Sequence, residues 1–305
     1  MHESQTRSAA SAGHYAFAAL IVSNLFLAFG PWMVRLADIG PVASGFWRLA
    51  LAIPLLLFFA WRSDGRTSFR PGASIAAMIV VGGFFFAAYL AAWHYGITLT
   101  KLANATLLGN MSSLLFPIYG FIAARMLPRK LQAVALGLAA AGAALLLGNS
   151  YALSPDHLKG DLLALLAGLF YTLYLISIDQ ARQTLKPMPV LALATIAGAG
   201  PLLLFALLLG EQVMPHNWTP LILLSLGSQV IGQGLLVYAM GHLSPLVVGL
   251  GLLTQPAVTA VIGSLAYDER LGLTDVAGAV LICAALVLIR LPERDATQPP
   301  SSRGA

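Results

Sequence analysis

The sequence predicts an all-α integral membrane protein in which ten transmembrane helices form two inverted five-helix repeats around a central cavity. Three observations predict this fold. Of the 305 residues, 58% are hydrophobic and only 10% are charged, and the mean hydropathy is +0.82. Apolar runs of spanning length follow one another along the whole chain. The second half of the chain also repeats the pattern of the first.

The composition leaves no room for a separate soluble domain. Soluble domains are typically about 45–50% apolar and about 25% charged, so this chain has too little polar surface to cover a water-facing globule. A membrane-spanning helix needs roughly 20 apolar residues. Ten such helices use about 200 positions and leave only short connections.

Gly, Pro and charged residues interrupt the apolar runs and set the expected boundaries. The spans are expected near residues 14–35, 41–61, 72–97, 102–123, 130–149, 160–178, 188–210, 218–240, 246–267 and 273–291. The first run is too long for the apolar part of a signal peptide, so we expect an uncleaved span. The expected organisation is a cytoplasmic tail (1–13), a first repeat (14–149), a periplasmic linker (150–159), a second repeat (160–291) and a cytoplasmic tail (292–305).

The basic residues predict the orientation. If the N-terminus is cytoplasmic, the cytoplasmic side carries Arg7, Arg62, Arg66, Arg70, Arg125, Arg129, Lys130, Arg182, Lys186, Arg290, Arg294 and Arg303. The opposite side then carries only Arg35, Lys101, Lys159 and Arg270. Cytoplasmic loops of membrane proteins are enriched in Lys and Arg. Both termini are therefore expected in the cytoplasm.

The two halves share a recognisable order of features. Tyr95, Pro117 and Gly137 in the first half have counterparts in Tyr238, Pro256 and Gly278 in the second. Five spans per half is an odd number, so a duplication places the halves in opposite orientations. Inverted repeats of this kind are typical of transporters that work by alternating access.

Polar side chains at mid-span predict a central cavity. They must face one another or a water-filled space, because hydrocarbon offers no hydrogen bonds. The candidates for the cavity wall are Asn24, Tyr89, Trp93, His94, Asn110, Ser113, Tyr171, Tyr174, Gln229, Gln233 and Gln255. The alternative is that the amides and hydroxyls join helices to one another, and for His94 a packing role competes with a proton relay.

Several other positions are candidates for gating or structural roles. Trp47 and Arg48 lie inside the second span, where a charge is costly and therefore indicates a functional position. Pro31, Pro117 and Pro256 lie inside spans and belong to the same group of candidates. Glu269 lies in the loop before the last span.

The charges also restrict the cargo. With these span boundaries, every Asp and Glu falls at a span end or in a loop. A transporter that exchanges cationic drugs for protons needs an anionic site inside the pore, and this chain offers none there. Binding of sugar phosphates needs several buried Lys or Arg residues, and Arg48 is the one Lys or Arg that falls inside a predicted span rather than at a span end. Amides can bind amino and carboxylate groups and aromatic walls can bind apolar side chains, which favours neutral amino acids.

The chain resembles the EamA-type, ten-helix members of the drug/metabolite transporter superfamily over residues 14–291. Trp47-Arg48, the central Pro117 and Pro256, and Asp268-Glu269-Arg270 before Gly278 carry this resemblance. It implies export of amino acids and related metabolites across the bacterial inner membrane, and the aromatic lining is similar to that of the aromatic amino-acid exporters. Glu269 matches the glutamate that both family halves usually carry, whereas the first half has Pro128-Arg129-Lys130 there.

The predicted function is export of neutral amino acids, including aromatic and hydrophobic ones, by alternating access through a central cavity, with facilitated diffusion as one form that this export can take. The main alternative is efflux of drugs or other amphipathic metabolites, coupled to protons through His94.

A membrane-embedded enzyme is disfavoured, because the sequence has no HExxH, GxSxG or phosphate-loop motif and no paired mid-depth carboxylates. A scaffold protein would not explain the pooled amides. We expect a monomer with a small solute and the lipid bilayer as partners, and no nucleic acid, metal or cofactor.

Overall fold

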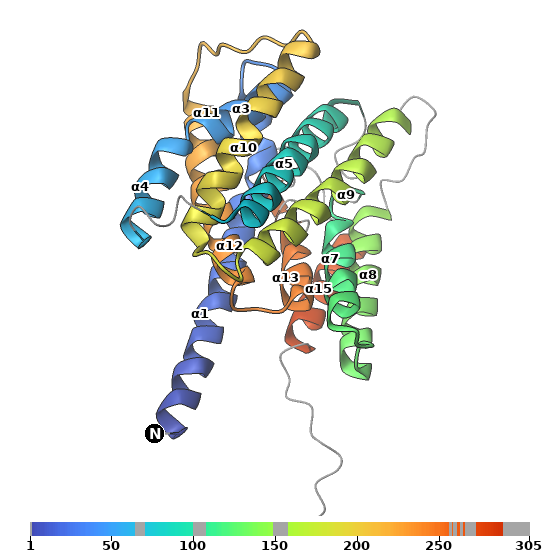
Figure 1. Ribbon diagram of the computed structural model, residues 1–305. Coiled ribbons are helices and arrows are strands. Elements are labelled where there is room, and N and C mark those ends of the chain that lie inside the picture. Colours follow the sequence, from blue (N-terminus) through green and yellow to red (C-terminus); the bar gives the residue numbers. More distant parts are fainter. Residues whose placement is uncertain are drawn as a thin grey trace, which may run out of the picture.

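The computed structural model describes residues 2–64, 71–99, 108–148, 158–255 and 273–288, together with the single positions 258, 261, 262 and 265 (Figure 1). Every regular element in this part of the chain is a helix. The first half contains α1 (His2–Ala28), α2 (Gly30–Leu36), α3 (Pro41–Ala50), α4 (Ile53–Asp64), α5 (Ala73–Leu99), α7 (Ser112–Ala124) and α8 (Lys130–Gly148). The second half contains α9 (Leu158–Ala181), α10 (Pro187–Leu208), α11 (Thr219–Leu224), the π-helix η3 (Ser225–Gly232), α12 (Gln233–Met240), α13 (Pro245–Leu252) and α15 (Leu273–Leu288).

Six segments of the described chain are long and apolar enough to cross a membrane. They are 14–36, 41–63, 73–99, 162–181, 187–208 and 219–240. The helices α7, α8, α13 and α15 lie in the four remaining predicted spans and are shorter. Each of the ten predicted ranges therefore holds a helix. Helix α1 begins at His2, so the residues before the first predicted span continue that helix, while positions 150–157 and 289–305 lie outside the described part.

Three of the six spanning segments are interrupted. In the first, α1 ends at Ala28 and α2 begins at Gly30, with Pro31 in the first turn of α2. In the second, α3 ends at Ala50 and α4 restarts at Ile53. In the last, the π-helix η3 separates α11 from α12. Pro lacks the N–H that continues a helix, which explains the first interruption.

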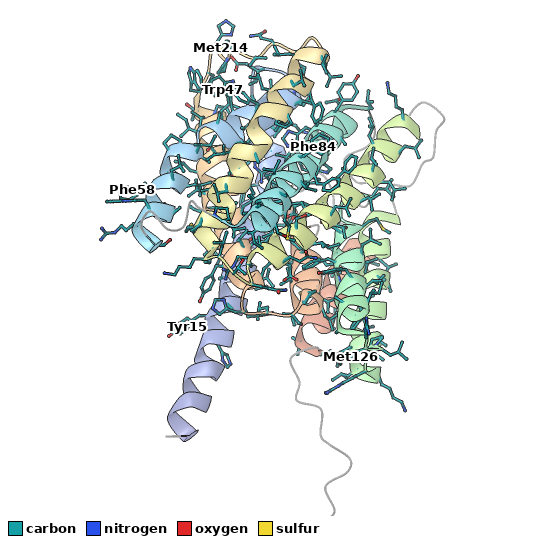
Figure 2. The ribbon with its side chains drawn as sticks, viewed as in Figure 1. Tyr15, Trp47, Phe58, Phe84, Met126 and Met214 are labelled. Carbon is teal, nitrogen blue, oxygen red and sulfur yellow. The ribbon has the colours of Figure 1, made fainter. Side chains whose placement is uncertain are left out.

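Large apolar side chains cover the outside of the helix bundle. Leu208 is 75% exposed and Ile122 is 71% exposed, and many further Leu, Val, Ile and Phe side chains point outward. Figure 2 shows side chains such as Phe58 and Phe84 projecting from the helices. Soluble monomers rarely expose large contiguous apolar surfaces. A surface of this kind fits contact with lipid.

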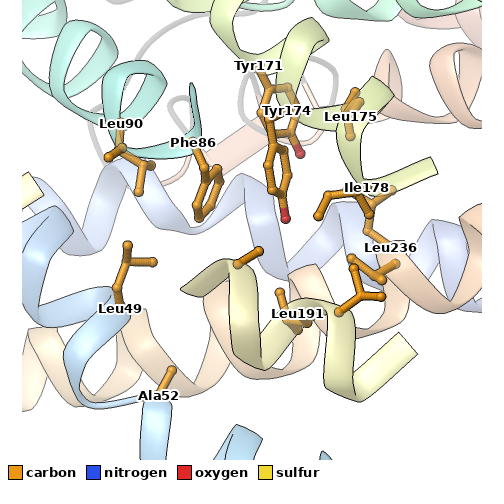
Figure 3. Packing of buried hydrophobic residues seen from close by; sticks show 14 of the residues in the cluster. Leu49, Ala52, Phe86, Leu90, Tyr171, Tyr174, Leu175, Ile178, Leu191 and Leu236 are labelled. Atoms are coloured by element: carbon orange, nitrogen blue, oxygen red, sulfur yellow. The ribbon is translucent and has the colours of Figure 1, made fainter. Parts of the chain in front are cut away.

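The buried core lies where α3, α5, α9, α10 and α12 meet. Figure 3 shows Leu49, Phe86, Tyr174, Leu191 and Leu236 converging from these five helices. The rings of Phe86 and Tyr174 stack with their centroids 4.4 Å apart. This packing ties α5 from the first half to α9 from the second.

At one end of the molecule the loop before α3 is clasped to the loop after α10. The carboxylate of Glu211 accepts hydrogen bonds from the N–H groups of Val42 (3.2 Å) and Ala43 (2.7 Å) at the start of α3. The indole N–H of Trp47 donates to the carbonyl of Val213 at 2.7 Å, and Figure 2 shows Trp47 and Met214 at this same end. We refer to these contacts of residues 38–47 with 211–218 as the clasp.

Asp38 completes the clasp. Its carboxylate accepts hydrogen bonds from the N–H groups of His216 (2.9 Å) and Asn217 (3.1 Å). These bonds, the one from His216 first, hold the pKa of the Asp38 carboxyl below its ordinary value of 3.8. They favour the charged form because they stabilise the ionised oxygen. The clasp is therefore built from the carboxylates of Asp38 and Glu211 bound to backbone N–H groups.

Replacing Glu211 with alanine is expected to lower the free energy of unfolding by about 1–3 kcal/mol, because two N–H groups at the start of α3 lose a charged acceptor. Thermal unfolding in detergent measures the effect. Gln212→Ala is the matched control, because Gln212 is the next residue in the sequence and its side chain is exposed. This substitution should change the free energy of unfolding by less than about 0.5 kcal/mol. Equal unfolding temperatures for the two variants would contradict the role of Glu211.

The helices α7 and α13 pack through reciprocal contacts between proline and glycine. A Cβ atom on Gly249 of α13 would lie 2.4 Å from the ring of Pro117 on α7, and a Cβ atom on Gly120 would lie 2.8 Å from Pro245. Each proline ring thus occupies the space that the facing glycine leaves open. Pro117, predicted as a gating or structural residue, lies buried at this helix contact.

Candidate functional site

One pocket gathers polar and aromatic side chains from both halves of the chain. Its walls come from α1, α2, α3, α5, α9 and α12 and from two short stretches around positions 110 and 255. The lining residues are Leu27, Ala28, Gly30, Pro31, Arg48, Tyr89, Trp93, Gly109, Asn110, Tyr171, Gln233 and Gln255. The space open to the centres of water-sized molecules is about 40 Å³. Since one water needs about 10–15 Å³ by this measure, the pocket has room for only a few waters in this conformation.

The pocket brings together a large share of the residues that the sequence analysis selected. Its walls include the predicted cavity residues Tyr89, Trp93, Asn110, Tyr171, Gln233 and Gln255. Pro31 and Arg48, which were predicted as gating or structural residues, also line it. Arg48 therefore faces the same space as the amides, although the sequence analysis did not place it in the cavity.

Arg48 is the charged group of the pocket. It lies on α3 and is only 4% exposed. Its Nε donates to Oε1 of Gln229 at 3.2 Å, and Nε2 of Gln229 donates to Oγ1 of Thr195 at 2.9 Å. Thr195 lies on α10 and Gln229 on η3, so this chain of hydrogen bonds fixes the guanidinium from two helices.

An aromatic wall stands beside the guanidinium. The ring centroids of Tyr89 and Tyr171 are 4.5 Å apart, and Trp93 stacks on Tyr89 at 6.2 Å. The guanidinium carbon of Arg48 lies 5.8 Å from the centroid of the Phe86 ring. Aromatic faces attract cations, so this wall partly compensates the buried charge of Arg48.

The amides of Asn24 and Gln255 join α1 to α13 and to the residues just after α13. The Nδ2 of Asn24 donates to the carbonyl of Gly251 at 2.7 Å, and Nε2 of Gln255 donates to Oδ1 of Asn24 at 2.9 Å. Asn24 is fully buried behind Gln255 and does not line the pocket itself. Its role is to hold Gln255, which does line it.

Four further predicted cavity residues lie near the pocket but outside its lining. Gln229 bonds to Arg48 as described above. Tyr174 stacks on Phe86, and Ser113 is buried where α7 meets α13. His94 is fully buried, and its Nδ1 lies 2.7 Å from the carbonyl of Pro41. A carbonyl only accepts, so this contact places a proton on Nδ1 and joins α5 to the start of α3.

Of the four remaining predicted positions, two lie in the described part of the chain. Trp47 belongs to the clasp, where it also packs edge-on against Trp218 with centroids 4.8 Å apart. Pro117 lies at the contact between α7 and α13. Pro256 and Glu269 lie outside the described residues.

The sequence analysis missed two features of the site. Thr195, which anchors Gln229, stands in an otherwise apolar stretch of α10 and gave no signal beyond being polar. The π-helix η3 was also missed, because an α-helical pattern places Ser225, Gln229 and Gln233 on one face. Single π-turns inside helices often occur at functional sites. Here η3 points Gln229 toward Arg48, while Gln233 reaches Tyr171.

Comparison with known proteins identifies the family. The model of the EamA-like transporter family matches residues 14–148 and again residues 158–291. An uncharacterized transporter from Archaeoglobus fulgidus is 24% identical over 260 residues, which cover 84% of this chain and 89% of that protein. A crystal structure of another protein superposes with a TM-score of 0.76 at 17% sequence identity, covering 92% of this chain and 96% of the other, which shows a shared fold.

Proposed function

This chain belongs to the EamA-like transporter family and is a multi-pass membrane transporter of small solutes rather than an enzyme, and we propose that it exports amino acids and related metabolites. The observation that carries the proposal is the pocket itself, which combines one guanidinium, three amides and an aromatic wall. These groups match the carboxylate, the amino group and the apolar side chain of an amino acid. Aromatic and hydrophobic amino acids fit this lining best.

The transport path lies between two inverted five-helix repeats in this proposal. The two family matches divide the chain into such halves. If spans one to five correspond to spans six to ten, the contact of α5 with α9 is equivalent to that of α1 with α12, and the contact of α7 with α9 is equivalent to that of α1 with α13. Three further contacts each join a span to its own counterpart in the other half. They are the contacts of α3 with α10, of α7 with α13 and of α8 with α15. This pairing supports a two-fold arrangement.

Alternating access then exposes the pocket to one side of the membrane at a time. The small volume of the pocket fits a conformation in which the path is narrow, and the clasp closes one end. We place the protein in the bacterial inner membrane as a monomer with both termini cytoplasmic. The distribution of basic residues supports this orientation. The clasp then lies on the periplasmic side.

Uptake of labelled phenylalanine, methionine and threonine into proteoliposomes tests the proposal. We expect saturable uptake of phenylalanine and methionine above the level of empty vesicles, because the aromatic wall favours apolar side chains. A labelled sugar phosphate serves as the control solute and should show no uptake. Amino-acid flux equal to that of empty vesicles would refute amino-acid export.

The alternative function, proton-coupled efflux of amphipathic drugs, makes a different prediction in the same vesicles. Arg48 is a cation inside the pocket and disfavours other cations there. His94 is bonded to Pro41 and does not line the pocket, so no described histidine offers a proton path through it. Phenylalanine uptake that ignores an imposed pH gradient would support facilitated diffusion. Phenylalanine uptake that follows the gradient would show proton coupling, and gradient-driven uptake of an amphipathic drug without phenylalanine uptake would favour the alternative.

A further inference from the structure

The guanidinium of Arg48 has more hydrogen-bond donors than its surroundings use. A guanidinium carries five N–H donors. In the part of the chain that the structure describes, its one hydrogen bond runs from Nε to Gln229. The terminal nitrogens, which form the fork that binds carboxylates in pairs of hydrogen bonds, have no acceptor among these residues. The pocket therefore presents an unused carboxylate-binding group.

The charge of Arg48 is also not neutralised by an acid. Neither the described neighbours of the guanidinium nor the residues that line the pocket include an Asp or Glu. The groups around it are the phenols of Tyr89, Tyr171 and Tyr174 and the ring of Phe86. A charge inside the bilayer is costly unless it is paired. An anionic ligand supplies the counter-charge that these side chains lack.

A second polar group of the pocket is also unsatisfied. Nε2 of Gln233 donates to the hydroxyl of Tyr171 at 3.3 Å, and Oε1 of Gln233 is buried without a partner among the described residues. Buried polar atoms are nearly always hydrogen-bonded. Gln233 lines the pocket together with Arg48, so a bound polar ligand is the natural partner for it.

The aromatic wall fixes where the rest of such a ligand lies. Tyr89 contacts both Tyr171 and Trp93, and all three residues line the pocket with Arg48. A solute whose carboxylate meets the guanidinium therefore has its apolar part against these rings. The arrangement matches a carboxylate joined by a short linker to an apolar or aromatic group.

We infer that Arg48 binds the carboxylate of the transported solute, so that the pocket selects monocarboxylates with an apolar or aromatic body and rejects amines that lack a carboxylate. The inference rests on the proposed function, because it assumes that the solute passes through this pocket. It goes further in making the carboxylate the required group. The amino group contributes less, through Gln233.

Competition against labelled phenylalanine in proteoliposomes of the unaltered protein tests the inference. Phenylpropionate lacks the amino group and is expected to compete within a fewfold of phenylalanine. Phenethylamine and phenylalaninamide lack the carboxylate and are expected to compete about tenfold more weakly or worse, because charge-assisted hydrogen bonds are lost. Phenethylamine that competes as well as phenylpropionate would overturn the inference and leave amino-acid transport standing.

Variants of Arg48 provide the second arm. Arg48→Gln is expected to lose the preference for phenylpropionate over phenethylamine, whereas Arg62→Gln, at the exposed end of the same span, should keep it. An Arg48→Gln protein that unfolds like the wild type and keeps the preference would also overturn the inference.

Thermal stabilisation by unlabelled compounds separates the inference from the proposed function. If phenylalanine uptake equals that of empty vesicles, amino-acid export fails, but stabilisation by phenylpropionate and not by phenethylamine would still support the role of Arg48. Stabilisation by neither compound, or equally by both, would refute it.

Discussion

Replacing Gln229 with leucine is expected to abolish transport and to lower the free energy of unfolding by about 2–3 kcal/mol. Gln229 accepts from Nε of Arg48 and donates to Thr195. Leucine has a similar size but neither accepts nor donates. The buried guanidinium then loses its one described hydrogen bond, and the penalty is large because the group is charged.

Two further variants distinguish the role of Gln229 in binding from its role in folding. Gln183→Leu changes an exposed glutamine and should leave both transport and unfolding unchanged. Gln229→Glu supplies the carboxylate that Arg48 lacks, so the folded protein should be at least as stable as the wild type while solute binding is lost to the internal ion pair. Flux measurements and thermal unfolding of these proteins check the expectation. A transport-competent Gln229→Glu protein would contradict it.

Replacing Gly249 with leucine is expected to prevent folding. A Cβ atom there would lie 2.4 Å from two ring atoms of Pro117 and 2.8 Å from the backbone oxygen of Ser113. A proline ring and a backbone carbonyl cannot rotate away, so α13 must separate from α7. Overpacking by even one or two carbons costs about 1–3 kcal/mol, and leucine adds four.

The yield of monodisperse protein in detergent measures this effect, and Gly249→Ala gives the intermediate case with a lowered unfolding temperature. Gly200→Leu on α10 is the control, because no atom lies within 4 Å of a Cβ built there. Normal yield and unfolding of Gly249→Leu would show that α7 and α13 do not pack as described.

Much of the fold could be predicted from the sequence because the bilayer imposes a simple rule. The length of the apolar runs alone was enough to predict ten ranges that each contain a helix. The family resemblance carried by Trp47-Arg48 and the central prolines is confirmed at the level of the EamA-like transporters. Closeness to the aromatic amino-acid exporters stays a prediction. The amides were selected because hydrocarbon leaves them no other partners, and Gln233, Gln255 and Asn110 line one pocket. That this pocket binds the solute stays a prediction.

The unpredicted features depend on contacts between distant parts of the chain. Arg48 and Gln229 are 181 positions apart in the sequence. No local pattern in either span predicts that their side chains form a hydrogen bond. The sequence pattern places Glu211 in a loop. In the structure its carboxylate accepts a hydrogen bond from the backbone N–H of Ala43, at the start of a helix 168 positions earlier. The α-helical period also treats residues 219–240 as uniform. Which polar residues face the pocket therefore follows from packing that single-span patterns do not contain.

The π-helix η3 has a consequence for how this chain compares with its relatives. A π-helix places more residues in each turn than an α-helix does, and in an α-helix one residue corresponds to a rotation of about 100°. A relative that lacks one residue between positions 225 and 232 would therefore present a different side of α12 to the pocket. A neighbour of Gln233 would take its place beside Tyr171. A single-residue gap in an alignment of this segment thus marks a change of pocket chemistry, even where every flanking residue is identical.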